Sequence, residues 1–386
     1  MFVRVIPWDR MVSGAQPKVG LVLGAGGVLG GAWLVGALDA LAAETGWDPG
    51  SADHVVGTSA GSMVGALLAC GIPPWFMAAH SLGENFGPLG AVQGAEPTEE
   101  DRSGGAVYRL HRRTPAIGPG SWKLALGSLA RPYRYAPAAV LAGWIPKGLV
   151  STESLKATVR RACPEGWAPH PGFWAVACDY QNGKRVPFGR GDAPEAPLPD
   201  AVAASCAIPG FYHPVTVEGR EYVDGGLRST SNLDVLADSG CELVICLNPM
   251  SSLHVAQPRT LGERAAMAMR SAAGRRLGSE ARRLRRQGIE VVLLQPTVHD
   301  LDAMGTNLMS SRRRREVLRR GRQSVVEHLR ESRIGEELSE RLPKGIPALV
   351  RRPEGPPSGW PSFRTLAERR HAPRRHAAVQ RGAAGP

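Results

Sequence analysis

Short apolar runs alternate with glycine-rich segments over the first 70 residues. Val19–Leu23 is an apolar run of strand length, and Gly30–Ala43 has the length and apolar content of a buried helix. Asp53–Gly57 and Ser59–Cys70 repeat this order of strand and helix. Because strands that alternate with helices form parallel sheets covered by helices, the pattern predicts an α/β fold.

The pattern is irregular between residues 71 and 150, where Pro, Gly and Trp are frequent. We interpret this region as an insertion that forms a cap or lid over the functional site. Regular elements return after it. The expected helices and strands are Leu155–Ala162, Phe173–Cys178, Arg185–Phe188, Pro199–Ser205, a strand at Tyr222–Asp224, Leu243–Leu247 and Val291–Leu294.

Two basic helices and a tail are expected in the C-terminal part. Thr260 and Glu263 have the spacing of a capping box, which predicts a helix to about Arg286, and a second basic helix spans about Ser311 to Arg333. Residues 343–386 hold 8 Pro and 5 Gly without an apolar period, a composition typical of disorder. We therefore expect a leader (1–17), a catalytic domain (18–300), a basic helical extension (301–342) and a disordered tail (343–386).

The net charge of +12 is concentrated in the C-terminal part. Residues 312–386 hold 19 Lys and Arg against 8 Asp and Glu, whereas the rest of the chain holds 28 against 27. The catalytic body is therefore nearly neutral, and the high pI alone does not indicate nucleic-acid binding. Solvated helix faces and attachment to an anionic membrane both explain the basic part, and we expect no nucleic-acid partner.

Targeting and redox features point to a cytoplasmic protein. The N-terminal segment lacks the apolar core of a secretory signal, and we identify no apolar run of the roughly 18 residues that span a membrane. The six Cys are scattered without metal-like spacing, so we expect reduced thiols, no metal and no cofactor. Peripheral contact with the inner membrane face is an option, and the oligomeric state is open.

Gly57-Thr58-Ser59-Ala60-Gly61 matches the G-x-S-x-G pattern of a nucleophile. In this pattern a sharp turn between strand and helix exposes the Ser side chain, and the flanking glycines let the backbone bend. A serine that only caps a helix would show the same five residues. The apolar strand before the motif and the apolar helix after it favour the nucleophile.

The earlier glycine-rich turn runs from Gly24 to Gly30. A dinucleotide loop is disfavoured because Leu29 stands where the G-x-G-x-x-G fingerprint has its last glycine. An oxyanion hole fits better, since the N–H groups of Gly26, Gly27 and Val28 can point at an oxygen that becomes negative during acyl transfer.

Ser59 requires a general base, and two candidates stand out. His213 follows an Ile-Pro-Gly-Phe-Tyr stretch, although an isolated His near a strand is more often structural. Asp224 is the better candidate, because it lies between a short strand and Gly225-Gly226. A carboxylate can act as base when it accepts the Ser proton directly.

Together these motifs resemble the patatin-like phospholipase family. That family combines a glycine-rich oxyanion loop, a G-x-S-x-G nucleophile and an Asp in a D-G-G or D-G-A turn. The blocks Gly148-Leu-Val-Ser-Thr-Glu-Ser-Leu155 and Ala203-Ala-Ser-Cys-Ala-Ile-Pro-Gly-Phe-Tyr-His-Pro-Val215 agree with it. The resemblance covers about Lys18 to Pro249 and implies a three-layer α/β/α sandwich with a central, mostly parallel sheet.

The resemblance also implies a lipid acyl hydrolase with a Ser59–Asp224 dyad and a lipid ester, phospholipid or acylglycerol, as substrate. The family often has Arg or Lys where this chain has Leu29, which leaves the head group open. Two alternatives remain: an α/β-hydrolase triad of Ser59, Asp224 and His254 or His299, and a non-catalytic lipid-binding protein. The motif glycines are Gly24, Gly30, Gly57, Gly61, Gly225 and Gly226.

Overall fold

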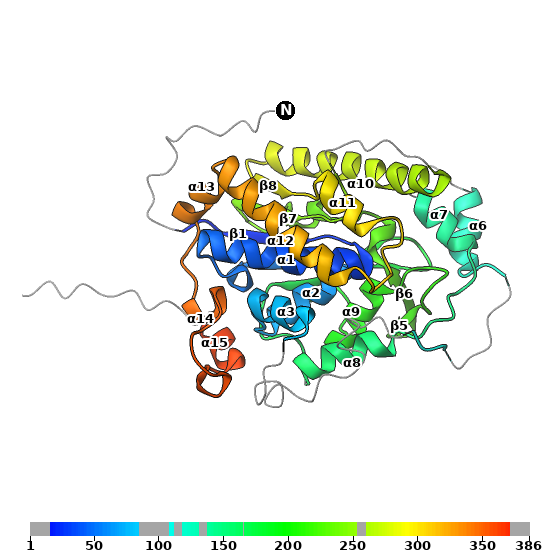
Figure 1. Cartoon of the computed structure of the whole chain (residues 1–386). Helices are drawn as coiled ribbons and strands as arrows, with labels where there is room; N and C mark the ends of the chain where they lie inside the picture. The colour runs from blue at the N-terminus through cyan, green and yellow to red at the C-terminus, as the bar shows by residue number, and fades with distance from the viewer. Residues whose placement is uncertain are drawn as a thin grey trace, which may run out of the picture.

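The computed structural model describes residues 16–84, 108–111, 118–130, 137–164, 166–252 and 260–370 of the 386-residue chain. These residues include an eight-stranded sheet with the order β5-β6-β3-β2-β1-β7-β8, with β4 paired to β3 (Figure 1). The five strands from β3 to β8 in this order are parallel. The strands are β1 (Val19–Leu23), β2 (His54–Thr58), β3 (Phe173–Asp179), β4 (Arg185–Phe188), β5 (Val215–Val217), β6 (Arg220–Asp224), β7 (Leu243–Leu247) and β8 (Glu290–Leu294).

Helices cover both faces of the sheet and make it a three-layer α/β/α fold, as expected. Side chains of β1 alternate between the faces, since Leu21 and Leu23 pack with the layer that contains α1 while Val22 packs with α10. The described helices are α1 (Gly27–Thr45), α2 (Ala60–Ala69), α3 (Pro74–Leu82), α6 (Trp122–Ala130), α7 (Pro137–Trp144), α8 (Glu153–Ala162), α9 (Leu198–Cys206), α10 (Leu261–Arg286), α11 (Val298–Met304), α12 (Arg314–Glu331), α13 (Ile334–Arg341), α14 (Pro347–Val350) and α15 (Phe363–Arg370).

The central helix of the layer is α1. It is long and apolar enough to cross a membrane, so the expectation that no apolar run of this length is present is wrong. Two thirds of its apolar window (67%) is buried inside the protein, and its buried side chains belong to the main core. A core helix of a globular domain has this character, so α1 belongs to the core.

The second basic helix, α12, packs against α1 along its length. A Cβ on Gly36 would lie 2.2 Å from the carbonyl oxygen of Leu318, and a Cβ on Gly321 would lie 2.6 Å from the Trp33 ring. These two glycines therefore permit the close approach of the helices. Since Val317 and Leu329 are buried in the same cluster, α12 is part of the helical layer rather than a separate extension.

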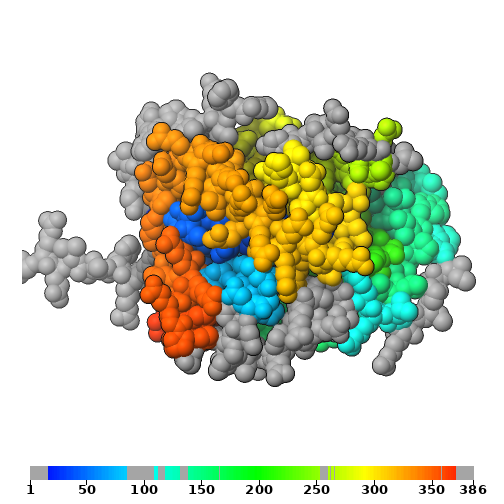
Figure 2. Space-filling view, viewed as in Figure 1, coloured from blue at the N-terminus to red at the C-terminus, as the bar shows by residue number. Residues whose placement is uncertain are grey.

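The prediction of a disordered tail is wrong for residues 343–370. This segment includes α14 and α15, and the Trp75 ring of α3 packs edge-on against the rings of Trp360 and Phe363. Figure 2 shows the orange C-terminal part lying against the blue and cyan elements of the N-terminal half. The apolar residues of this segment are too sparse to show a helical or strand period in the sequence, but they pack against α3 in the structure. Residues 371–386 lie outside the described residues.

The region interpreted as a lid is divided in the structure. Its first helix, α3, belongs to the helical layer, where Met77 and Ala78 join the main core. The helices α6 and α7 pack on each other and on Cys178, Tyr180 and Val223 of the sheet. Residues 85–107, 112–117 and 131–136 lie outside the described residues, so a lid over the site stays a prediction.

Candidate active site

The carboxyl ends of β2 and β6 meet on one edge of β3. Ala175 and Val176 pair with both β4 and β2, whereas Ala177 and Cys178 pair with both β4 and β6. Because a strand has two edges and β4 occupies one, β2 and β6 share the other. Since β2 is parallel and β6 antiparallel to β3, Thr58 faces Val176 and Asp224 faces the next residue, Ala177. This register brings Ser59 and Asp224 together.

Ser59 lies on a sharp turn between β2 and α2. Its φ of 54° and ψ of −123° depart from those of ordinary residues, as the nucleophile motif predicts. A Cβ on Gly57 would lie 2.4 Å from Cα of Ser62, and a Cβ on Gly61 would lie 2.0 Å from the Leu23 carbonyl oxygen. Both flanking positions therefore require glycine, and the turn has no room for a larger side chain.

Ser205 of α9 holds this turn against β3. The Ser59 N–H donates to Ser205 Oγ at 3.0 Å, and the Ser205 hydroxyl donates to the Val176 carbonyl at 2.6 Å. The Cys206 thiol also donates to the Ser59 carbonyl at 3.2 Å. The sequence analysis did not assign Ser205 a role, although it lies in one of the two blocks that support the family resemblance.

Asp224 is buried at the end of β6 and faces Ser59. Burial raises its carboxyl pKa from 3.8 to about 6, while hydrogen bonds from the Ser59 side chain and from the Gly226 N–H oppose this rise. The Gly226 N–H lies 2.7 Å from Oδ1. A Cβ on Gly225 would lie 2.3 Å from the Val176 carbonyl oxygen, so glycine is required after the Asp. The carboxyl group is thus desolvated and in direct contact with the Ser59 side chain.

The glycine-rich loop lies beside both turns. A Cβ on Gly31 would contact Cβ of Ala60, and a Cβ on Gly226 would lie 3.8 Å from Cβ of Ala25. Glycine is needed in the loop itself, because a Cβ on Gly24 would lie 2.4 Å from Asn248 Oδ1 and one on Gly26 would lie 2.6 Å from Cα of Gly30.

The helix α1 begins at Gly27, three residues before the expected start, and Gly27 has a φ of 61°. The early start places the backbone of Gly27 and Val28 in the first turn of the helix, where amides have no partner within the helix. Leu29 N–H donates to the Leu308 carbonyl and Gly30 N–H to the Gly26 carbonyl. Within the described part of the chain, the N–H groups of Gly26, Gly27 and Val28 have no backbone acceptor. They are positioned as a helix N-terminus that favours negative charge.

The Leu29 side chain is buried in the main core. An Arg at this position would have to bury its charge or displace the packing between α1 and its neighbours. The departure of this residue from the family pattern is therefore a change in the core of this chain.

The described candidate histidines, His213 and His299, are not among the partners of the Asp224 side chain. His213 stacks on His111 with ring centroids 4.0 Å apart, and burial lowers its pKa. His299 is exposed on α11, and His254 lies outside the described residues. In the described ranges, the side-chain partners of Asp224 are Ser59 and Gly226. Those ranges also contain no cluster of three His, Cys, Asp or Glu residues suited to a metal.

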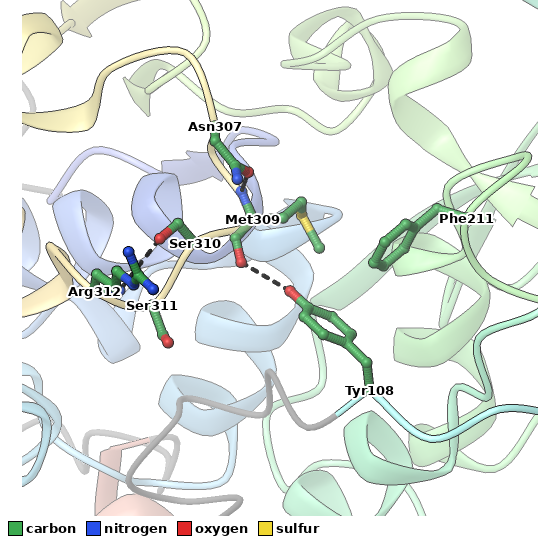
Figure 3. A pocket seen from close by; sticks show the side chains of 7 residues that line it. All are labelled: Tyr108, Phe211, Asn307, Met309, Ser310, Ser311 and Arg312. Carbon is green, nitrogen blue, oxygen red and sulfur yellow. Dashed lines mark hydrogen bonds between the residues drawn. The ribbon is translucent and has the colours of Figure 1, made fainter.

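A pocket of about 480 Å³ opens next to the glycine-rich loop (Figure 3). Its wall joins an apolar side, Tyr108, Phe211 and Met309, to a polar side that includes Arg312. The Tyr108 hydroxyl donates to the Met309 carbonyl at 2.8 Å, and the Tyr108 and Phe211 rings meet edge to face. A Cβ on Gly27 would lie 3.0 Å from Met309 Sδ, so the pocket borders the loop that carries the free amides.

The mostly parallel sheet, the strained serine turn and the glycine-rich loop form the arrangement that the sequence resemblance implies. A family model described as patatin-like phospholipase matches residues 21–237, more than half of the chain. The chain belongs to the patatin-like phospholipase family, which is a family of lipid hydrolases, and the resemblance seen in the sequence is confirmed.

The individual proteins that resemble this chain match it over only part of its length or at low sequence identity. Uncharacterized NTE family proteins of Mycobacterium tuberculosis and Mycobacterium bovis are 38% identical over 76 residues, which is 20% of this chain and 20% of each relative. The chain therefore matches about a fifth of the length of these curated relatives. The crystal structure of VipD from Legionella pneumophila aligns with 83% of this chain and 68% of its own at 15% identity, with a TM-score of 0.38.

Proposed function

We propose that this protein is a serine acyl hydrolase that cleaves carboxylic ester bonds of lipids. Ser59 is the nucleophile, Asp224 the general base, and the N–H groups of Gly26, Gly27 and Val28 form the oxyanion hole. The observation that carries this proposal is the contact between Ser59, on its strained turn, and a buried Asp224 whose pKa is raised to about 6. A general base is most effective when its pKa lies near the working pH.

The reaction follows from these positions. Asp224 takes the hydroxyl proton of Ser59 as Oγ attacks the ester carbonyl, and the amides of the glycine-rich loop stabilise the oxygen that becomes negative. Asp224 then gives the proton to the leaving alcohol, which leaves an acyl group on Ser59. In the second half, Asp224 takes a proton from water, the hydroxide attacks the acyl carbonyl, and the proton returns to Ser59 as the fatty acid departs.

The pocket beside Gly27 supports a lipid substrate. The side chains of Tyr108, Phe211 and Met309 offer an apolar surface, while Arg312 lies at its polar side. We propose that part of the lipid ester, of the phospholipid or acylglycerol class, binds there. The mechanism uses no metal and no organic cofactor, and nucleic acid has no part in it.

Cellular location is also part of this proposal. We place the enzyme in the cytoplasm, with peripheral contact to the inner membrane face. All six cysteines are buried and none forms a disulfide, which is compatible with a reducing compartment.

The dyad is tested with Ser59→Ala, Asp224→Asn and the double variant, assayed on a p-nitrophenyl ester. Each single change is expected to lower turnover by about 10³-fold or more. The double variant is expected to be no worse than the singles, because the two groups act as one unit. His213→Ala is the matched control and is expected to keep its turnover. A His variant as inactive as Ser59→Ala would indicate a triad, and a wild type without hydrolysis would favour the lipid-binding alternative.

A further inference from the structure

Exposed apolar side chains are concentrated in one short region. Among the described residues, nine large apolar side chains are 41–75% exposed, and eight of them lie between residues 108 and 149. The exception is Met269 on α10. Single exposed apolar residues are ordinary on protein surfaces, whereas a cluster marks an interaction site.

Five of the eight lie on the outer faces of α6 and α7. On α6, Trp122, Leu126 and Leu129 follow the spacing i, i+4, i+7, while Leu124 and Ala125 on the opposite face are buried. On α7, Leu141 and Trp144 are exposed, whereas Ala139 and Ala142 are buried. We call the five exposed residues the α6–α7 face. Both helices are thus apolar on their inner side and again on the side that faces solvent.

The described residues that neighbour this face in the chain carry positive charge. Residues 108–111, 118–130 and 137–152 include Arg109, Lys123 and Lys147 and no Asp or Glu, and both Arg109 and Lys123 are exposed. Basic residues near a membrane surface are attracted to anionic lipids, and Trp is enriched at the boundary between lipid and water. A second copy of this chain would bring the same positive charge to the contact. The composition therefore favours an anionic lipid surface.

The inner sides of α6 and α7 pack on the part of the sheet that carries Asp224. The Tyr180 hydroxyl donates to the Ala142 carbonyl at 2.9 Å, which ties α7 to the residue that follows β3. Leu124 and Ala142 pack with Val223, the neighbour of Asp224 in the chain. Figure 1 shows α6 and α7 together at one end of the molecule, on the far side from α13 to α15.

The basic helix α12 is less suited to the same task. Arg322 and Arg330 form ion pairs with Asp39 and Glu44 of α1, and Arg314 is buried and donates to the Ser81 carbonyl. Three of the six arginines of α12 are therefore used to attach the helix to the protein.

We propose that the α6–α7 face docks on an anionic lipid bilayer by inserting its Trp and Leu side chains into the interface. The choice of a bilayer as partner rests on the proposed lipid substrate, whereas docking itself does not require hydrolysis. Insertion of apolar side chains would be reinforced by the exposed Arg109 and Lys123.

The test measures co-sedimentation of full-length Ser59→Ala protein with vesicles, so that no lipid is consumed. One set of vesicles contains phosphatidylcholine with phosphatidylglycerol, and the other contains phosphatidylcholine alone. The triple variant Leu126→Gln, Leu129→Gln, Leu141→Gln is expected to bind the anionic vesicles roughly tenfold more weakly or worse, since each Leu loses apolar transfer energy. Met269→Gln on α10 is the matched control and is expected to bind as the parent does. Thermal unfolding confirms that each variant is folded.

Three outcomes would overturn the proposal. Equal binding by the triple variant and the parent would remove the α6–α7 face from membrane docking. If the Ser59→Ala protein does not bind vesicles although the wild type hydrolyses esters, docking is rejected and the proposed enzyme function still holds. Conversion of an oligomer to a monomer by the triple substitution, in a protein that does not bind vesicles, would assign the face to a second copy of the chain. Binding that persists in high salt and depends on the three leucines would support insertion, because salt screens the attraction between charges.

Discussion

Asp224 couples the stability of the protein to its proposed chemistry. Burial raises its pKa from 3.8 to about 6. Between about pH 4 and pH 6 the folded protein retains a proton that the unfolded chain releases, so the free energy of unfolding falls as the pH rises through this window. Above about pH 6 the folded state carries the full cost of a buried carboxylate, roughly 3 kcal/mol for a shift of about two pH units. Activity has the opposite slope, because a base must be deprotonated.

Replacement of Asp224 by Asn is therefore expected to stabilise the protein while it abolishes hydrolysis. The Asn Oδ1 can still accept the Gly226 N–H, and no charge is buried. At pH 8 we expect the free energy of unfolding of Asp224→Asn to exceed that of wild type by about 1–3 kcal/mol. The gain is expected to disappear near pH 4. Wild-type turnover is expected to fall as the pH drops below about 6.

Urea unfolding at the two pH values measures this difference. Asp192→Asn is the control, since Asp192 is exposed beside Arg190 and its pKa is lowered by that hydrogen bond, so its replacement brings no gain at high pH. An Asp224→Asn protein that is no more stable than wild type at pH 8 would show that Asp224 is not destabilised by burial.

At the scale of elements, α9 and β3 together position the nucleophile. Ser205 of α9 accepts the buried N–H of Ser59 and donates to the Val176 carbonyl of β3. Its hydroxyl touches no reacting atom in the proposed mechanism, so Ser205 is a positioning residue. The strained backbone of Ser59 depends on such support, because a sparsely populated conformation persists only where its surroundings hold it.

Ser205→Ala is expected to lower kcat more than it changes KM, because it loosens the turn without removing a group that binds substrate. It leaves a buried N–H and a buried carbonyl without their partner, and the expected loss of stability is about 1–3 kcal/mol. Ser128→Ala is a matched control, since the Ser128 hydroxyl is also buried but donates to Ala125 within its own helix. Steady-state kinetics of both variants measure the changes in kcat and KM, and urea unfolding measures the change in stability. A Ser205→Ala enzyme with unchanged kcat would show that the turn needs no support from α9.

Local features of the fold were predictable from the sequence. The strands β1 and β2 and the turn at Ser59 were recognisable because short apolar runs end in glycines whose positions are dictated by close backbone contacts at Gly57 and Gly61. The alternation of strand and helix likewise predicted a parallel sheet, which the pairings of β1, β2 and β7 confirm.

Features that depend on long-range pairing were not predictable. The shared edge of β3 joins residues near 58 and 224 through residue 176, and no local pattern carries that register. The role of Ser205 depends on the same arrangement. Residues 343–370 were predicted to be disordered from their composition. Composition does not reveal that the few aromatic side chains of this segment pack against α3.

At the scale of the whole molecule, the C-terminal segment is attached to the N-terminal half by a buried ion pair. Arg370 lies at the end of α15 and binds Asp48, near the start of the chain, through two nitrogens at 2.6 and 3.0 Å. It also donates to the Leu68 carbonyl at 2.9 Å. The two charged side chains are 2% and 1% exposed. Both partners of this ion pair are buried, whereas the arginines of the α12 pairs are 51% and 69% exposed. Loss of one partner of the buried pair leaves a charge without compensation.

Truncation after Pro343 is therefore expected to destabilise the protein by at least about 3–5 kcal/mol, the usual cost of removing one partner of a buried ion pair. It also uncovers Trp75 and Phe76, which pack on Phe363. Truncation after Arg370 retains this pair and is the matched control, expected to unfold as the full chain does. Arg160→Gln, which breaks an exposed pair with Glu153, is expected to have a much smaller effect because solvent screens it. Urea unfolding of the three proteins tests the difference, and a chain that ends at Pro343 with full stability would show that the C-terminal segment only rests on the surface.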